Sequence, residues 1–220
     1  MHQPGRGIFI TFEGIEGCGK TTQIAILAQA LEKQGHQVVV TREPGGSPIA
    51  NQIRSILLSA DNVAMVPLTE LFLYEAARAQ HLAEVVMPAL DRGAIVLCDR
   101  FIDATIAYQG YGRGLDLSTI GTLNRLATSG LTPQLTLLFD CDVETGLGRA
   151  QARIASLTGE REERFELESL AFHERVRQGY LALAQQEPER FAIIPAKGDI
   201  DQVSQTVWQE TLQRFASGLR

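Results

Sequence analysis

The stretch IFITFEGIEGCGKT, residues 8–21, decides the fold of this 220-residue chain. Its first five residues are apolar or β-branched and predict a buried strand. The residues after them match G-x-x-x-x-G-K-[ST], and residues 22–34 follow with the apolar spacing of a helix. Glycines let backbone N–H groups point inward, and a helix N-terminus favours anions. The stretch therefore predicts a strand, a loop and a helix that together hold the phosphates of a nucleoside triphosphate.

The side chains of this loop have distinct expected roles. Lys20 would reach the β- and γ-phosphates, and the Thr21 hydroxyl would be a ligand of Mg²⁺. Cys18 lies beside Lys20 and a helix N-terminus, which makes a thiol reactive, although a small filler residue is the favoured interpretation. The predicted triphosphate-binding residues are Gly14, Ile15, Glu16, Gly17, Cys18, Gly19, Lys20, Thr21 and Thr22.

Four more short apolar runs alternate with helix-length segments along the chain. They are residues 38–41, 94–98, 135–139 and 191–194. Near-continuous apolar runs indicate strands that are covered on both faces, and the intervening segments of about 10 to 25 residues suit crossover helices. We therefore predict an α/β fold of the P-loop NTPase type, with a five-stranded parallel sheet flanked by helices, in one domain over residues 1–220.

One segment, about residues 149–166, is dense in charge and poor in large apolar side chains. A segment that buries little apolar surface is expected to be a mobile lid, and a solvated helix face followed by a loop is the alternative. Arg149 and Arg153 are four residues apart and share one helix face, and Arg161 and Arg164 follow them.

Composition limits the kinds of partner. The chain carries 20 basic and 26 acidic side chains, a formal charge of −6, so polyanions such as nucleic acid and anionic membranes would repel it. No apolar stretch approaches the roughly 20 residues that cross a bilayer. Three widely spaced cysteines favour reduced thiols in the cytoplasm over a disulfide framework or a zinc site. We expect small-molecule substrates, no nucleic acid and no membrane.

Two further motifs point to a second anionic substrate. The guanine-reading pattern Asn-Lys-x-Asp and the transport-ATPase signature Leu-Ser-Gly-Gly-Gln are absent. Instead TREPGG (residues 41–46) and DRF (residues 99–101) each follow a predicted strand, where open α/β sheets place ligands. A carboxylate there suits a Mg²⁺-bound water and a guanidinium suits a phosphate, although structural ion pairing is the alternative. The pattern favours a kinase over a nucleotide-switched binding protein.

These motifs resemble those of the thymidylate kinases, in particular the bacterial type with basic residues in the lid. The resemblance rests on Phe12-Glu13-Gly14, the two motifs above and AYQGYGRG (residues 107–114), in family order and spacing from about residue 7 to residue 166. It implies transfer of the γ-phosphoryl group of ATP to dTMP, giving ADP and dTDP on the route to dTTP. It also implies Mg²⁺ and a homodimer. Another deoxynucleotide or deoxynucleoside kinase is the closest alternative.

The resemblance also assigns roles to residues of the acceptor site. Arg54 and Arg100 match the pair that holds the dTMP phosphate. Tyr74 and Arg78 match positions that stack on and hydrogen-bond the thymine ring. From the spacing alone, the commoner interpretation of such a pair is a tyrosine that packs in the core and an arginine that lies on the surface. Glu16 matches a position near the sugar 3′-hydroxyl, Glu43 a position beside the Mg²⁺ and the sugar, and Tyr108 a position against the sugar 2′-carbon. Thr105 and Gln109 match positions that face the polar edge of the base. The implied dTMP-binding residues are therefore Glu16, Glu43, Arg54, Tyr74, Arg78, Arg100, Thr105, Tyr108 and Gln109.

The catalytic residues implied by the resemblance surround the transferred group. Asp99 and Asp140 both end predicted strands, and the family pattern favours Asp99 as the carboxylate that holds Mg²⁺ through water, with Asp140 structural. Gln151 stands where a further lid arginine is common. The implied catalytic residues are Lys20, Asp99, Arg100, Arg149 and Arg153, and Thr21 and Asp99 are the expected metal-side residues.

Overall fold

The computed structural model describes residues 7–155 and 164–215 and contains a five-stranded sheet with the order β2-β3-β1-β4-β5. Every neighbouring pair of strands is parallel. The strands are β1 (Ile8–Glu13), β2 (Val38–Arg42), β3 (Ile95–Asp99), β4 (Leu135–Asp140) and β5 (Phe191–Pro195). The predicted fold class is confirmed, and each strand agrees with its predicted run to within one residue at either end.

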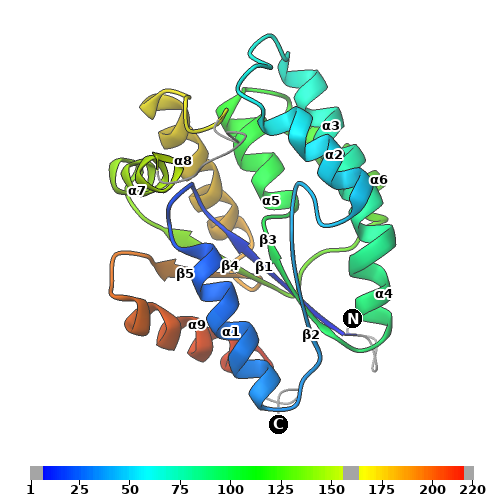
Figure 1. Cartoon of the computed structure of the whole chain (residues 1–220), viewed down its shortest axis with the longest axis vertical. Coiled ribbons are helices and arrows are strands. Elements are labelled where there is room, and N and C mark those ends of the chain that lie inside the picture. Colours follow the sequence, from blue (N-terminus) through cyan, green and yellow to red (C-terminus); the bar gives the residue numbers. More distant parts are fainter. Residues whose placement is uncertain (1–6, 156–163, 216–220) are drawn as a thin grey trace.

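Helices cover both faces of this sheet (Figure 1). Helices α1 and α9 pack together over one face, and α4 and α8 contact strands on the other. Two π-helical turns, η1 and η2, continue α3 and α5. The helical elements are α1 (Lys20–Lys33), α2 (Pro48–Leu58), α3 (Pro67–His81), η1 (Leu82–Val86), α4 (Met87–Asp91), α5 (Ile102–Thr105), η2 (Ile106–Gly112), α6 (Leu117–Thr128), α7 (Val143–Ala155), α8 (Leu170–Gln186) and α9 (Ile200–Phe215).

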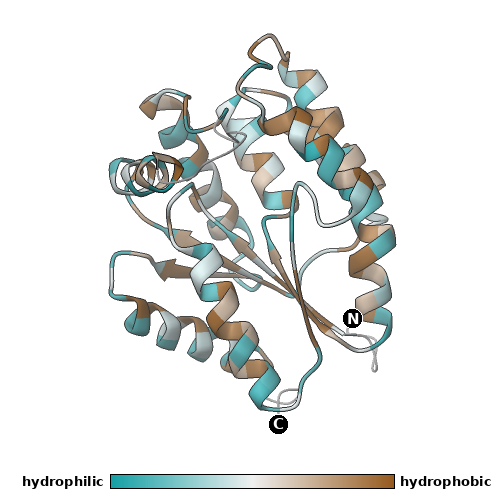
Figure 2. Ribbon diagram, viewed as in Figure 1, coloured by the Kyte–Doolittle hydropathy of each residue, from teal (hydrophilic) through white to brown (hydrophobic). Residues whose placement is uncertain are grey.

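The alternation of side chains along each strand explains the two apolar layers. Phe9 of β1 packs with Val96 of β3 and with Leu90 of α4, whereas Ile10 belongs to a second cluster with Leu27 of α1. All these side chains are almost fully buried. The strands are accordingly largely hydrophobic in Figure 2, as expected for a parallel sheet with helices on both faces.

The parallel register brings the carboxyl ends of the strands to one edge of the sheet. Phe12 of β1 and Arg42 of β2 both pair with Asp99 of β3, and Asp140 ends β4 on the other side of β1. The strand before the phosphate loop therefore lies between the two strands that end in aspartates. This edge is where an open α/β sheet binds ligands.

The charged segment is helical at its start. Helix α7 includes residues 149–155 and so places Arg149 and Arg153 one turn apart. Residues 156–163, with Arg161, lie outside the described residues. The predicted lid mobility stays a prediction.

Across the part of the chain that the structure describes, no helix is both long and apolar enough to span a bilayer.

Candidate active site

The loop between β1 and α1 wraps around the Lys20 side chain. The Lys20 ammonium donates to the carbonyl oxygens of Gly14 at 3.1 Å and Ile15 at 2.9 Å. Gly17 has a φ of 68°, and a Cβ there would lie 1.9 Å from the Gly146 carbonyl oxygen of α7. Only glycine fits this contact, so the start of α7 packs directly on the phosphate loop.

The two strand-end aspartates have different surroundings. The Thr21 hydroxyl donates to Oδ2 of Asp99 at 3.4 Å, which brings the two expected metal-side residues together. Asp140 instead receives two N–H groups of Arg177, at 2.7 and 3.0 Å. Residues 7–155 and 164–215 contain no cluster of three acidic, His or Cys side chains for a metal. A hydroxyl and a carboxylate nevertheless suit Mg²⁺, which keeps several waters and shares phosphate oxygens of its substrate.

Arg100 joins the phosphate loop to the centre of the site. Its guanidinium donates to Glu16 at 2.9 Å and to the Tyr180 hydroxyl at 3.1 Å, and lies 4.9 Å from the Tyr108 ring centroid. The Tyr108 hydroxyl donates to the same Glu16 oxygen at 2.6 Å. Arg100 also has a φ of 69°, a left-handed conformation that costs a non-glycine residue free energy and is concentrated at functional sites.

Glu16 is ionised although it is buried among these groups. Burial raises the pKa of its carboxyl group, but the Arg100 charge and the contacts with His173 and Tyr108 outweigh burial, and the net pKa is well below its usual range. Nδ1 of His173 lies 3.4 Å from the second oxygen of Glu16, within ion-pair distance. Nε2 of His173 contacts the Phe165 carbonyl oxygen at 2.9 Å, so this histidine connects Glu16 with the end of the charged segment.

The motif at residues 41–46 is held in place by His81. Its Nδ1 lies 3.0 Å from Glu43 and its Nε2 lies 2.6 Å from the Thr41 hydroxyl. A Cβ on Gly46, whose φ is 88°, would come within 2.5 Å of the His81 ring. The Glu43–Pro44 peptide bond is cis, and the Glu43 backbone N–H donates to the Asp99 carbonyl oxygen at 2.9 Å. The loop after β2 is therefore tied to the end of β3.

Arg78 lies in the interior, so the interpretation of this residue as a surface charge is wrong. Its side chain is almost fully buried, and each of its five N–H groups has a protein acceptor. Burial lowers its pKa, but Glu43 and Glu75 more than compensate and the net pKa is raised. The acceptors are Glu43 at 2.8 Å, Glu75, Asn124 and Thr105 at 2.9 Å each, and the Phe101 carbonyl oxygen at 3.1 Å.

Tyr74, which is expected to stack on the base, lies near other aromatic side chains. The Tyr74 ring lies 6.4 Å from the Phe165 ring, which in turn packs edge-on to Tyr108. Burial and the nearby Glu70 raise the Tyr74 pKa, opposed by the charges of Arg100, Arg164 and Arg54. Tyr74 is thus a partly buried aromatic side chain whose surroundings include positive charge.

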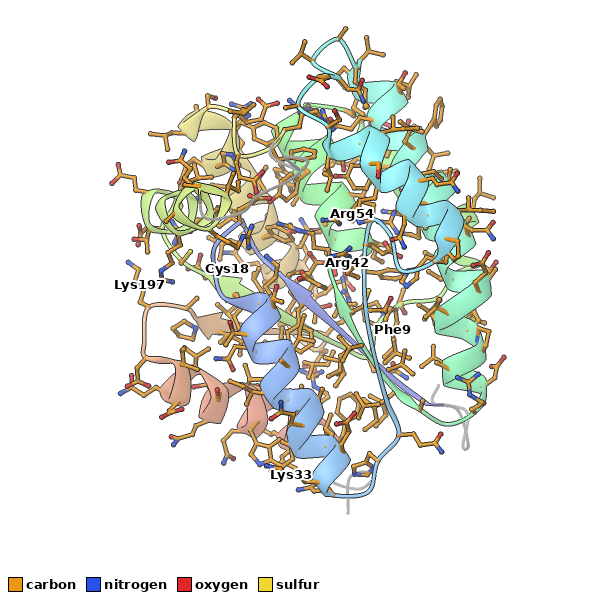
Figure 3. The ribbon with its side chains drawn as sticks, viewed as in Figure 1. Phe9, Cys18, Lys33, Arg42, Arg54 and Lys197 are labelled. Carbon is orange, nitrogen blue, oxygen red and sulfur yellow. The ribbon has the colours of Figure 1, made fainter. Side chains whose placement is uncertain are left out.

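Arg54 reaches this space from α2. Its Nη1 donates to the Pro44 carbonyl oxygen at 2.9 Å, and its Cδ would lie 3.5 Å from a Cβ on Gly45. Figure 3 shows Arg54 and Arg42 near each other at the end of β2, above the sheet edge that carries the phosphate loop. Of the two arginines expected to hold the acceptor phosphate, Arg54 is therefore anchored on the loop after β2, and Arg100 is anchored on Glu16 and Tyr180.

Comparison with known proteins matches this geometry to one family. The family model for thymidylate kinase matches residues 12–207. The thymidylate kinase of Geotalea uraniireducens is 63% identical over 212 residues, which are 96% of this chain and 100% of the relative. The chain belongs to the thymidylate kinase family. The thymidylate kinase of Trichlorobacter lovleyi is 64% identical over 95% of this chain and 99% of its own length.

The solved structures agree with this family assignment. The crystal structure of thymidylate kinase from Ehrlichia chaffeensis has a TM-score of 0.77 to this chain with 36% sequence identity. The match covers 94% of this chain and 99% of that one. This chain and that thymidylate kinase therefore share one overall architecture.

The arginines of the charged segment have three different surroundings in this member of the thymidylate kinase family. Nη1 of Arg149 approaches the Ala196 carbonyl oxygen after β5 at 3.5 Å. Arg153 is 58% exposed and lies 3.9 Å from Glu166. Arg164, unlike both, is buried and forms an ion pair with Glu70 of α3 at 2.6 Å. The charged segment, for which a solvated helix face was the alternative interpretation, therefore includes a buried arginine near its end.

Three buried groups, Glu13, His81 and His173, have no role predicted from the sequence. Glu13 accepts from the Phe101 backbone N–H at 2.7 Å and from the Tyr180 hydroxyl at 2.8 Å. Burial and the charge of Asp103 raise the pKa of Glu13 to about 8. His81 and His173 bridge segments that are far apart in the sequence. Two sequence signals mark Glu13: it ends the first strand directly before the phosphate loop, and it belongs to the Phe12-Glu13-Gly14 motif of the family resemblance.

Proposed function

We propose that this chain transfers the γ-phosphoryl group of ATP to dTMP, giving ADP and dTDP, in the synthesis of dTTP. The observation that carries the proposal is the contact between Arg100 and Glu16. Glu16 belongs to the phosphate loop and Arg100 to the acceptor side, so the two substrate sites meet at this ion pair. A nucleotide switch or a hydrolase needs no second phosphate site of this kind.

The reaction needs positioning more than proton removal. The dTMP phosphate has a second pKa of about 6 and is already largely a dianion near neutral pH, so it attacks without a strong general base. Two anions must be held in line, which the positive side chains of Lys20, Arg54 and Arg100 favour. Arg149 and Arg153 would add charge to the transferred group from α7, and an arginine in this role can contribute a factor of about 10³ to 10⁵.

Mg²⁺ is the expected cofactor of this reaction. Thr21 and Asp99 would hold it, Thr21 directly and Asp99 through water, since these two side chains meet at the mouth of the phosphate loop. When bound, the ion neutralises charge on the β- and γ-phosphate oxygens. ATP would contact Gly14, Ile15, Gly17, Cys18, Gly19 and Thr22 through the loop and the first turn of α1.

The nucleoside of dTMP would lie between the phosphate loop and the space around Tyr74. Glu16 and Tyr108 would meet the sugar, and the hydrogen bond between them supports a common role. Thr105 and Gln109 would face the base. Arg78 supports this wall through Thr105, and Glu43 fixes Arg78 from the opposite side.

The test is a coupled assay of ADP release from ATP in the presence of Mg²⁺, with dTMP, dUMP, UMP, dCMP, dAMP or no acceptor. We expect turnover that depends on dTMP and on Mg²⁺. Turnover of dAMP or UMP without turnover of dTMP would refute the substrate. Slow hydrolysis that no monophosphate stimulates would support the nucleotide-switched binding protein instead.

We further propose a homodimer formed through α2 and α3. Ile49 and Ile56 lie two turns apart on α2 and Phe72 lies on α3, and each is roughly half exposed. The two helices pack together, so these side chains offer an apolar surface to a second copy. Sedimentation velocity should give a dimer for the wild type and a monomer for Phe72→Glu. A wild-type monomer at micromolar concentration would contradict the proposal.

We also infer that the enzyme works in the cytoplasm. Cys18, Cys98 and Cys141 are all buried free thiols, a state that a reducing compartment maintains. Fractionation of cells that produce the tagged protein tests this inference.

A further inference from the structure

Glu70 of α3 is a buried carboxylate at which three side chains meet. Only 1% of it is exposed. Its Oε1 accepts from Nε2 of Gln109 at 2.8 Å and from Nε of Arg113 at 3.2 Å. Its Oε2 accepts from Nη2 of Arg113 at 3.2 Å and from Nη1 of Arg164 at 2.6 Å. The donors come from the region of η2 and from the end of the charged segment, so Glu70 is the common acceptor of distant elements.

This arrangement leaves the Gln109 amide a single favourable orientation. Each oxygen of Glu70 receives an arginine N–H, so toward Gln109 the carboxylate can only accept. Gln109 must therefore turn its NH₂ group to Glu70. Rotation of the amide by half a turn would place its carbonyl oxygen against the carboxylate, where two acceptors repel, and would remove Glu70 as the acceptor of the Gln109 NH₂ group. Among the hydrogen bonds of the described residues, none uses the side-chain oxygen of Gln109, so this oxygen is the group that Gln109 offers elsewhere.

We propose that Glu70 is a positioning residue that determines base specificity through Gln109. The inference rests on the proposed function, in which Gln109 faces the polar edge of the base. With its NH₂ held by Glu70, Gln109 presents only an acceptor to that base. Thymine and uracil carry an N–H donor at position 3, whereas cytosine carries an acceptor there. The fixed amide therefore favours dTMP over dCMP, because cytosine would meet acceptor with acceptor.

The two arginines explain why position 70 carries a carboxylate. Arg113 and Arg164 are largely buried and need a negative partner at short distance. A neutral amide at position 70 would satisfy neither charge and could either donate to Gln109 or accept from it. The orientation of the Gln109 amide would then no longer be fixed.

The test compares Glu70→Gln with Glu168→Gln as a matched control. Glu168 also forms an ion pair with Arg113 but does not contact Gln109, so the control removes a neighbouring ion pair alone. For each protein, the KM for dTMP and the inhibition constant of dCMP against dTMP are measured. The ratio of the inhibition constant to the KM gives the preference for dTMP over dCMP, and neither constant depends on the fraction of active protein.

We expect Glu70→Gln to reduce the preference for dTMP over dCMP at least tenfold, since leaving a buried polar group unpaired changes an equilibrium by a factor of about ten or more. Glu168→Gln should stay within twofold of the wild type. The proposal is overturned if the preference of Glu70→Gln for dTMP over dCMP stays within twofold of the wild type. It is also overturned if Glu70→Gln still shows no dCMP binding.

If Glu70→Gln does not fold, Glu70→Asp replaces it, because aspartate keeps the charge for the arginines and withdraws the carboxylate from Gln109 by one methylene. A folded Glu70→Asp variant with the wild-type ratio overturns the proposal equally. Wild-type protein that does not phosphorylate dTMP would refute the proposed function itself. Wild-type turnover with an unchanged ratio in the variants would refute the role of Glu70 alone.

Discussion

The most direct test of the buried ion network is Arg78→Lys. The substitution keeps the positive charge but reduces five N–H donors in a planar fork to three on a flexible stem. The guanidinium of Arg78 has an acceptor for each of its five donors. Lysine therefore leaves at least two acceptors without a donor in a space closed to water.

The expected loss of stability follows from this count. Each buried acceptor left unpaired costs about 1–3 kcal/mol, so two of them reduce the free energy of unfolding by about 2–6 kcal/mol. For a domain of about 150–250 residues, 1 kcal/mol shifts Tm by roughly 2–4 °C. We expect a decrease in Tm of about 5–20 °C for protein without substrates.

Differential scanning calorimetry of the wild type and the variant measures this decrease. Arg125→Lys is the control, because Arg125 lies exposed on α6 and donates to the neighbouring Thr122. Its Tm should change by less than 2 °C. If Arg78→Lys also changes Tm by less than 2 °C and only raises the KM for dTMP, Arg78 acts as a substrate ligand and the structural argument is refuted.

Three further outcomes test other parts of the site. Arg153→Ala should lower kcat at least tenfold with a smaller change in the KM for dTMP, and a kcat within twofold of the wild type would place the transition-state role elsewhere. Asp99→Asn should raise the Mg²⁺ concentration needed for half-maximal turnover, whereas Asp140→Asn, which loses the Arg177 ion pair, should lower Tm and leave the Mg²⁺ requirement unchanged. Burial raises the pKa of Glu13 to about 8, whereas the same carboxyl group in the unfolded chain has a pKa of about 4.5. Between these two values the folded protein holds a proton that the unfolded chain has released. The free energy of unfolding therefore falls as pH rises from about 4.5 toward 8. Urea unfolding at pH 5.5 and pH 8 should show a smaller fall for Glu13→Gln than for the wild type, and equal falls would contradict this assignment.

The fold was predictable because its determinants are local. Each strand is a short apolar run, and the loop after β1 is a fixed spacing of glycines before Lys20. β3 and β4 both lie beside β1, and the family pattern favoured Asp99 of β3, rather than Asp140 of β4, as the aspartate on the metal side; the structure has Asp99 beside Thr21. These features depend on neighbours in the sequence or on the parallel order of the strands.

The interior ion pairs were not predictable in the same way. Glu70 and Arg164 are 94 residues apart, and Glu16 and Arg100 are 84 apart, so no periodicity connects them. A charged residue in a polar segment is normally solvated, and only the fold shows that Arg164 is buried against α3. The same limit applied to Arg78, whose spacing from Tyr74 identified a shared helix face but not its burial.

The number of protein acceptors distinguishes an arginine that holds the fold from one that can hold a ligand. Arg78 has five acceptors for five donors, so any bond to a base would have to replace an existing one. Arg100 donates to Glu16 and to Tyr180, which leaves N–H groups of its fork for a phosphate. Its partner Glu16 is an anion that a phosphate dianion can displace from the guanidinium. Acidic side chains outnumber basic ones in this chain, but several of the carboxylates form ion pairs with buried arginines. One of them, Glu16, pairs with Arg100 where the acceptor phosphate is expected. The net charge of −6 is therefore compatible with an anionic substrate.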